Sequence, residues 1–185
     1  AAPKKEGKNT KEISRSHKVI TSDNGLVTIT GGKWTSYRLM AEDTVDKAIE
    51  VCGLPKRKCV TKKFRIHGYR KNPDLTDHMY VYGSDEPKIL QLIEKEPALG
   101  EKLSEKFGYT LAEVVWAVRE EMAITLEDVL ARRVRLLFVD AREAIAAAPK
   151  AAAIMARELG RDQAWIDEQV KSFTDLAKNY IFEQK

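Results

Sequence analysis

The chain has 185 residues, of which 43% are hydrophobic, and this is enough to bury a core in one or two small domains. We expect neither a secretion signal nor a membrane-spanning helix, because the first residues lack an apolar run and no segment reaches about 18 apolar residues. The net charge of +4 reflects residues 56–71, which hold eight Lys and Arg and no acid, so the basicity is local and does not indicate a nucleic-acid-binding protein.

The first residue of the chain, its cysteines and its histidines limit the kind of protein that it can be. Because the sequence starts without methionine, we expect a piece cut from a longer polypeptide, with a processed product as the alternative. Cys52 and Cys59 are the only cysteines, which favours reduced thiols in a cytoplasmic protein. His17, His67 and His78 stand apart, with no carboxylate or cysteine at ligand spacing, so we expect no metal site.

The first elements in chain order are a β-hairpin and a helix. Residues 16–30 place β-branched residues on both sides of an Asp-Asn-Gly turn, which predicts the hairpin. From Thr35 to Val51 the apolar residues fall at helical spacing, and Gly53 and Pro55 end the pattern. We expect residues 1–55 to form a first structural unit that ends here.

Residues 56–73 have no sustained period and predict an extended basic linker. The alternative for this segment is contact with anionic lipid headgroups, worth about 1 kcal/mol for each basic residue near the membrane surface.

The rest of the chain, residues 74–185, predicts an all-helical domain. Thr110 with Glu113 and Thr125 with Asp128 have the spacing of capping boxes at two helix starts. A further helix is expected to open at Pro149 and close at Gly160, and a last one to begin near Asp162. The fold class is therefore mainly α. The cluster Arg132, Arg133 and Arg135 follows acidic residues, so ion pairing is the default interpretation and anion binding the alternative.

The residues between the predicted hairpin and the first helix carry the chemistry. Gly31, Gly32 and Lys33 match neither a phosphate loop nor a dinucleotide fingerprint. However, the free N–H groups of the first helical turn and the Lys33 charge would act on the same spot. Such a corner suits a phosphate, or an electron-rich ring that becomes anionic on reduction. Arg38, one turn further on, belongs to this motif or pairs with Glu42 at i+4.

Two long motifs resemble one family. The stretch "ISRSHKVITSDNGLVTITGGKWTSYRLMAEDTVDKAI" resembles the segment that closes the flavin domain of FAD-dependent glycerol-3-phosphate dehydrogenases. The stretch "EVVWAVREEMAITLEDVLARRVRLLFVDAREAI" is similar to the C-terminal helical domain of the same family. The resemblance implies that the hairpin and first helix complete a flavin-binding domain absent from this chain, since no Gly-x-Gly-x-x-Gly turn is present.

The resemblance also implies roles for particular residues. FAD contacts fall on Gly31, Gly32, Lys33, Trp34 and Thr35, although FAD is not expected to stay bound to this chain alone. Arg15 matches the arginine that binds the substrate phosphate, and Lys33 is a second candidate for substrate contact. No catalytic residue is identified in these 185 residues.

The implied activity is oxidation of glycerol 3-phosphate to dihydroxyacetone phosphate, with electrons passed to a quinone. The implied partners are the missing N-terminal FAD domain and, through a peripheral contact, the inner face of a membrane. A glycerol-3-phosphate oxidase, which uses oxygen, is the alternative within the family. A helical interaction module without enzymatic activity is the alternative from another class.

Overall fold

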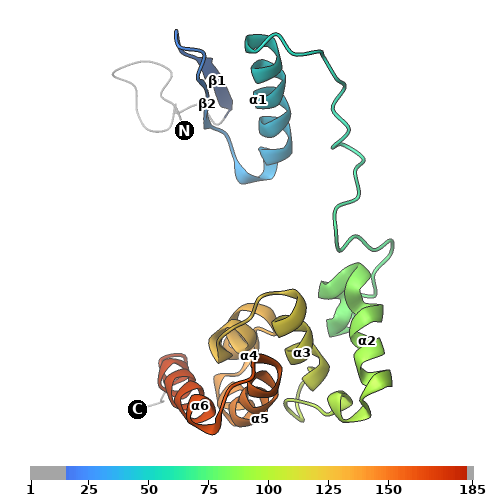
Figure 1. Ribbon diagram of the computed structural model, residues 1–185, viewed down its shortest axis with the longest axis vertical. Coiled ribbons are helices and arrows are strands. Elements are labelled where there is room, and N and C mark those ends of the chain that lie inside the picture. The colour runs from blue at the N-terminus through green and yellow to red at the C-terminus, as the bar shows by residue number, and fades with distance from the viewer. Residues whose placement is uncertain (1–15, 183–185) are drawn as a thin grey trace. The chain divides into compact units, whose positions relative to one another are not determined.

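The computed structural model describes residues 16–182 and divides the chain into two compact units (Figure 1). The first unit ends at Ile66 and the second begins at His67. Helices make up most of the regular structure, so the mainly-α fold class is confirmed. None of the helices among residues 16–182 is long and apolar enough to cross a membrane.

The first unit contains the expected hairpin. Strand β1 (His17–Thr21) pairs antiparallel with β2 (Val27–Gly31), and the register sets His17 opposite Gly31. In the turn, the Asn24 side-chain oxygen accepts hydrogen bonds from the Ser22 hydroxyl at 2.8 Å and the Leu26 N–H at 3.2 Å. The local chemistry of the Asp-Asn-Gly sequence therefore fixes the hairpin and its register.

A short 3-10 turn, η2 (Trp34–Ser36), leads from β2 into helix α1 (Tyr37–Val51), which packs along the hairpin (Figure 1). Between residues 16 and 66 no side chain is fully buried. Two strands and one helix cannot enclose a core, so this unit leaves large apolar side chains in contact with solvent.

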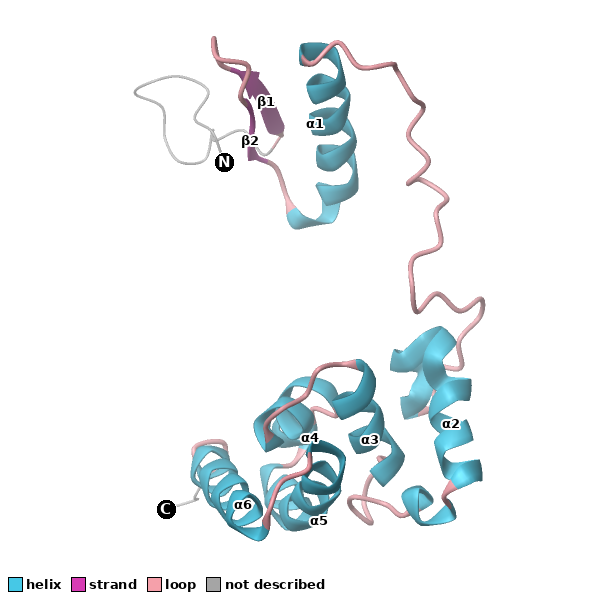
Figure 2. Ribbon diagram, in the orientation of Figure 1, coloured by secondary structure: helices cyan, strands magenta, loops and turns pink. Residues whose placement is uncertain are grey.

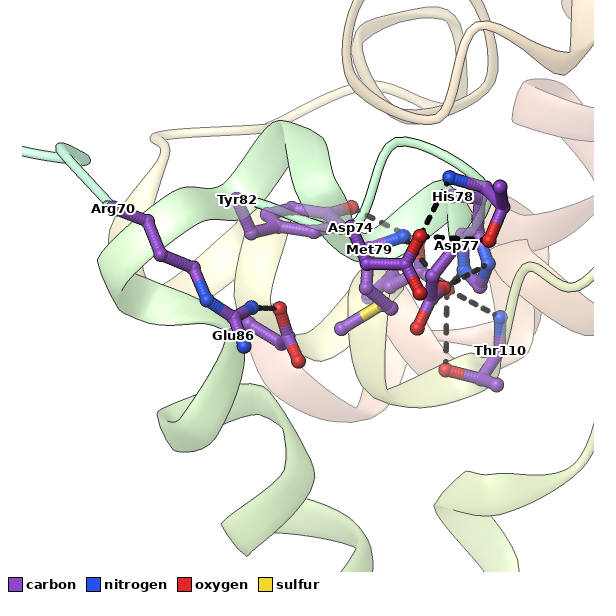
Figure 3. A network of polar contacts seen from close by, with 10 residues as sticks. Arg70, Asp74, Asp77, His78, Met79, Tyr82, Glu86 and Thr110 are labelled. Atoms are coloured by element: carbon purple, nitrogen blue, oxygen red, sulfur yellow. Dashed lines mark hydrogen bonds and ion pairs between the residues drawn. The ribbon is translucent and has the colours of Figure 1, made fainter. Parts of the chain in front are cut away.

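The chain between α1 and the helical unit forms neither helix nor strand (Figure 2). Its last part is held to the second unit. The Ser84 N–H donates to the Gly68 carbonyl at 3.2 Å, and Arg70 forms an ion pair with Glu86 (Figure 3).

The second unit is helical throughout. Its elements in chain order are η3 (His78–Asp85), α2 (Glu86–Lys95), η4 (Pro97–Gly100), α3 (Leu111–Glu120), η5 (Asp128–Arg133), α4 (Leu136–Val139), α5 (Ala141–Leu159) and α6 (Gln163–Lys178). Helix α5 contacts α3, α4 and α6, and its buried face consists almost entirely of alanine (Figure 1). Small side chains let the neighbouring helices approach α5 closely. This unit holds the hydrophobic core of the described chain.

Capping side chains begin the helices where the sequence predicts. The Glu113 carboxylate accepts from the Thr110 N–H at 2.7 Å, and the Asp128 carboxylate accepts from the Thr125 N–H at 3.0 Å. After Thr125 the chain turns with the wider hydrogen bonding of a π-helix. Gly160, at φ 64°, ends α5 in the left-handed conformation.

One expected helix start is wrong. The sequence predicts a helix that opens at Pro149 and closes at Gly160, but α5 begins well before this proline. Its start is set by Asp140, whose carboxylate accepts hydrogen bonds from the N–H groups of Arg142 and Glu143, both at 3.1 Å. Pro149 lies inside the helix, where it removes one backbone hydrogen bond. Burial of the alanine face on both sides of the proline keeps the helix continuous.

Candidate functional site

The glycine corner, residues 31–35, joins β2 to α1 and has a backbone that only glycine adopts easily. Gly31 and Gly32 have φ angles of 77° and 82°. A Cβ atom on Gly32 would lie 2.7 Å from the Met40 sulfur and 3.1 Å from the His17 Cβ. The positive φ angles of both residues and the close packing around Gly32 explain why two glycines lie here.

Beyond the glycines the corner is open to solvent. The Lys33 carbonyl accepts from the Ser36 hydroxyl at 2.9 Å, which closes the 3-10 turn. The Trp34 side chain is 86% exposed and stacks on Tyr37 with ring centroids 5.6 Å apart. Lys33 is exposed and forms no ion pair with another residue of the described range 16–182. An exposed lysine and an exposed indole ring therefore follow directly on the two glycines.

Side-chain contacts tie the hairpin to α1 and engage Arg38 within the first unit. His17 Nε2 lies 2.6 Å from the Asp43 carboxylate, so the strand opposite Gly31 is tied to the helix. Arg38 donates to Glu42 at 2.6 Å and to the Thr61 hydroxyl at 3.0 Å. Of the two alternatives for Arg38, the structure shows the i+4 pairing with Glu42, and the guanidinium is engaged within the protein.

The structure describes five of the six expected site residues. Gly31, Gly32, Lys33, Trp34 and Thr35 lie together in one turn between β2 and α1. Arg15 lies outside the described residues.

A second polar cluster surrounds Glu113 in the helical unit; sequence spacing reveals its pairing with Thr110 but not its contacts with His78 and Tyr82. The Glu113 side chain is only 1% exposed and accepts four hydrogen bonds. Figure 3 labels the three residues that donate them, His78, Tyr82 and Thr110. The hydrogen bonds come from His78 Nε2 at 3.2 Å, the Tyr82 hydroxyl at 3.1 Å, and the N–H and hydroxyl of Thr110 at 2.7 and 3.3 Å. A buried carboxylate needs such donors because it has lost its water.

The cluster changes the acidity of its members. The hydrogen bond with Glu113 raises the pKa of His78, against the opposing effect of burial. Burial raises the pKa of the Tyr82 phenol far above its usual range, and the nearby Glu113 adds to the shift. Tyr82 therefore stays protonated and acts only as a hydrogen-bond donor to the carboxylate.

Each histidine pairs with a carboxylate distant in sequence, namely His17 with Asp43, His67 with Asp85, and His78 with Glu113. No spacing rule connects such positions, because tertiary packing brings them together. Within residues 16–182 no group of three or more His, Cys, Asp or Glu could hold a metal ion.

Comparison with known proteins decides the family. The family model described as the C-terminal domain of alpha-glycerophosphate oxidase matches residues 28–166, which include both the glycine corner and most of the helical unit. The chain belongs to this family.

Curated relatives agree with the family assignment. A probable mitochondrial glycerol-3-phosphate dehydrogenase of Dictyostelium discoideum is 34% identical over 94% of this chain. The mitochondrial glycerol-3-phosphate dehydrogenase of Rattus norvegicus is 35% identical over 90% of the chain, and SDP6 of Arabidopsis thaliana, of the same description, is 32% identical over 94%. The matched regions are 29%, 25% and 32% of the respective relatives, so the chain spans only a quarter to a third of their length.

Proposed function

We propose that this chain is the C-terminal portion of an FAD-dependent glycerol-3-phosphate dehydrogenase, which oxidises glycerol 3-phosphate to dihydroxyacetone phosphate and passes the electrons to a quinone. The family membership and the names of the relatives support the dehydrogenase part of this proposal. In this proposal residues 1–55 close the FAD and substrate domain, residues 56–73 are a basic linker, and residues 74–185 form the helical C-terminal domain.

The observation that carries the proposal is the geometry of the glycine corner. Its two glycines, at positive φ, turn the chain from β2 toward α1, and Lys33, which has no ion-pair partner within residues 16–182, follows them directly. When bound, FAD supplies the hydride acceptor for the substrate carbon. The corner's backbone N–H groups and the Lys33 ammonium favour negative charge in their vicinity, and they need not reorganise to do so. Trp34 and Thr35 complete the surface that faces the cofactor.

The substrate needs a separate anchor for its phosphate. We assign this role to Arg15, because a planar and permanently charged guanidinium pairs with two phosphate oxygens at once. Lys33 is the second candidate for substrate contact. The base that accepts the hydroxyl proton belongs, in this proposal, to the part of the enzyme outside these residues.

The family description itself favours one alternative acceptor. It names a glycerophosphate oxidase, so a reaction with oxygen in place of a quinone is the second candidate. A cytoplasmic location with peripheral contact to a membrane through residues 56–71 belongs to the quinone version of the proposal, whereas the relatives are named as mitochondrial enzymes.

The test is a redox titration of FAD in the longer polypeptide that we propose contains this chain. Lys33→Ala should lower the reduction potential of the bound flavin, because the mutant loses a cation that favours the reduced, more negative ring. Lys47→Ala is the matched control, since Lys47 lies on α1 but pairs with Glu50 at 3.0 Å. An absence of FAD from the purified longer protein, or an unchanged potential in Lys33→Ala, would refute the proposed role of the corner.

A further inference from the structure

A pocket of about 400 Å³ opens in the helical unit beside the buried Glu113. It lies among residues of η3, the start of α3, and the segment that joins η5 to α4. Apolar side chains form much of its wall, and polar ones face it from several elements; the wall includes His78, Val81, Tyr109, Val134, Arg135 and Phe138. The volume lies within the range of small-molecule sites.

Most charged groups of the pocket are already compensated. Glu113 accepts its four hydrogen bonds from within the protein. Arg133 donates to the backbone carbonyls of Asp128 and Glu121, at 3.2 and 2.5 Å, and pairs with the Asp128 carboxylate at 3.5 Å. These groups hold the fold together and have little capacity left for a ligand.

Arg135 differs from the other members of the arginine cluster. Arg132 pairs with Glu127 at 2.6 Å and with Asp128 at 3.0 Å, and Arg133 is engaged as described. Within the described part of the chain, the Arg135 guanidinium makes neither an ion pair nor a hydrogen bond. Its backbone is left-handed, with φ 63° and ψ 18°, which is uncommon for a residue other than glycine. Ion pairing thus accounts for two of the three arginines.

The Tyr109 hydroxyl is a second hydrogen-bond donor in the pocket. The Tyr109 ring packs edge-on against His78, with ring centroids 5.2 Å apart. Among residues 16–182 its hydroxyl has no hydrogen-bond acceptor. Tyr109 and Arg135 both line the pocket. One spare cation and one spare hydroxyl thus accompany the apolar wall.

We propose that this pocket binds a small amphipathic carboxylate. Its carboxylate pairs with Arg135 and accepts a hydrogen bond from Tyr109, while its apolar part lies against Val81, Val134 and Phe138. The buried Glu113 does not repel the ligand strongly, because four donors compensate its charge. All residues of this pocket belong to the helical unit, and the proposal does not depend on the function proposed for the glycine corner.

The test compares three probes with the same eight-carbon chain and different head groups: octanoate, octan-1-ol and octylammonium. Calorimetric titration of the 185-residue chain should show that octanoate binds at least about tenfold more tightly than either of the others, as expected for a charge-assisted contact. Inorganic phosphate, which has charge but no apolar part, should bind more weakly than octanoate.

Variants locate the contact. Arg135→Asn should weaken octanoate binding at least about tenfold, and it should fold, since asparagine tolerates the left-handed backbone. Arg132→Asn is the matched control and should bind octanoate as the unaltered chain does, because Arg132 lies in the same cluster but is already paired. Thermal unfolding of each variant checks that the fold is intact.

The other outcomes refute the proposal. Equal binding of octanoate and octan-1-ol would show an apolar docking surface without carboxylate recognition. Octanoate binding that survives Arg135→Asn would place the contact elsewhere. If the chain binds vesicles of anionic lipid through Arg135 but binds no free octanoate, the surface contacts membranes and is not a small-molecule site.

Discussion

Gly83 offers the sharpest test of how the linker joins the helical unit. This glycine lies inside η3 with φ 53° and ψ −118°, a conformation that residues with a side chain rarely adopt. A Cβ atom at this position would lie 1.8 Å from the Gly68 carbonyl oxygen. The same oxygen accepts a hydrogen bond from the Ser84 N–H at 3.2 Å. Gly83→Ala therefore cannot keep both its own backbone and the docked position of Gly68.

The expected loss follows from these two effects. The unfavourable backbone angles cost about 1–3 kcal/mol, and undocking Gly68 loses one hydrogen bond worth about 1 kcal/mol. We therefore expect Gly83→Ala to lower the free energy of unfolding of the helical unit by about 2–4 kcal/mol, measured by urea denaturation. The Ser84 amide should also exchange its hydrogen faster.

Gly160→Ala is the matched control. Gly160 also has a positive φ, 64°, but a Cβ atom there would meet nothing within 4 Å. Its substitution should cost about 1–2 kcal/mol, from the left-handed backbone alone. If Gly83→Ala costs no more than Gly160→Ala, or if the Ser84 amide keeps its protection, the close approach of Gly68 to Gly83 is wrong.

Three further predictions concern pH, local stability and the substrate. The raised pKa of His78 means that its pairing with Glu113 stabilises the fold fully below about pH 6.5, and that this contribution is lost as pH rises through the folded-state pKa. His78→Asn should remove this part of the pH dependence of urea unfolding. An unchanged pH profile in His78→Asn would contradict the prediction. Amide hydrogen exchange should be slow in residues 110–138 and faster before Gly31, because no side chain between residues 16 and 66 is fully buried. Equal protection would mean that the hairpin has found another covering surface. In the longer enzyme, Arg15→Ala should lower kcat/KM by an amount equivalent to about 2–4 kcal/mol of lost transition-state stabilisation, since a phosphate contact acts in ground and transition states alike. The FAD content should stay normal. Wild-type kinetics would return Arg15 to a structural role.

Features that depend on neighbouring residues could be predicted from the sequence. The hairpin follows from its Asp-Asn-Gly turn, the starts of α3 and η5 from Thr110 and Thr125, and the end of α5 from Gly160. The two glycines after β2 indicate a tight corner in the same way. In each case the hydrogen bond or the backbone angle that decides the structure lies within a few residues, so the local sequence contains the cause.

Tertiary structure decided the features whose cause lies far along the chain. Pro149 favours a helix start locally. However, α5 continues past this proline, because its alanines are buried against α3, α4 and α6. The pairing of His78 with Glu113 joins residues 35 positions apart, and no spacing rule connects them. The sequence by itself thus determined the local turns, the caps and the family. The buried polar cluster and its pocket exist only in the folded unit, because the packed helices remove Glu113 from water and its carboxylate then needs polar groups around it.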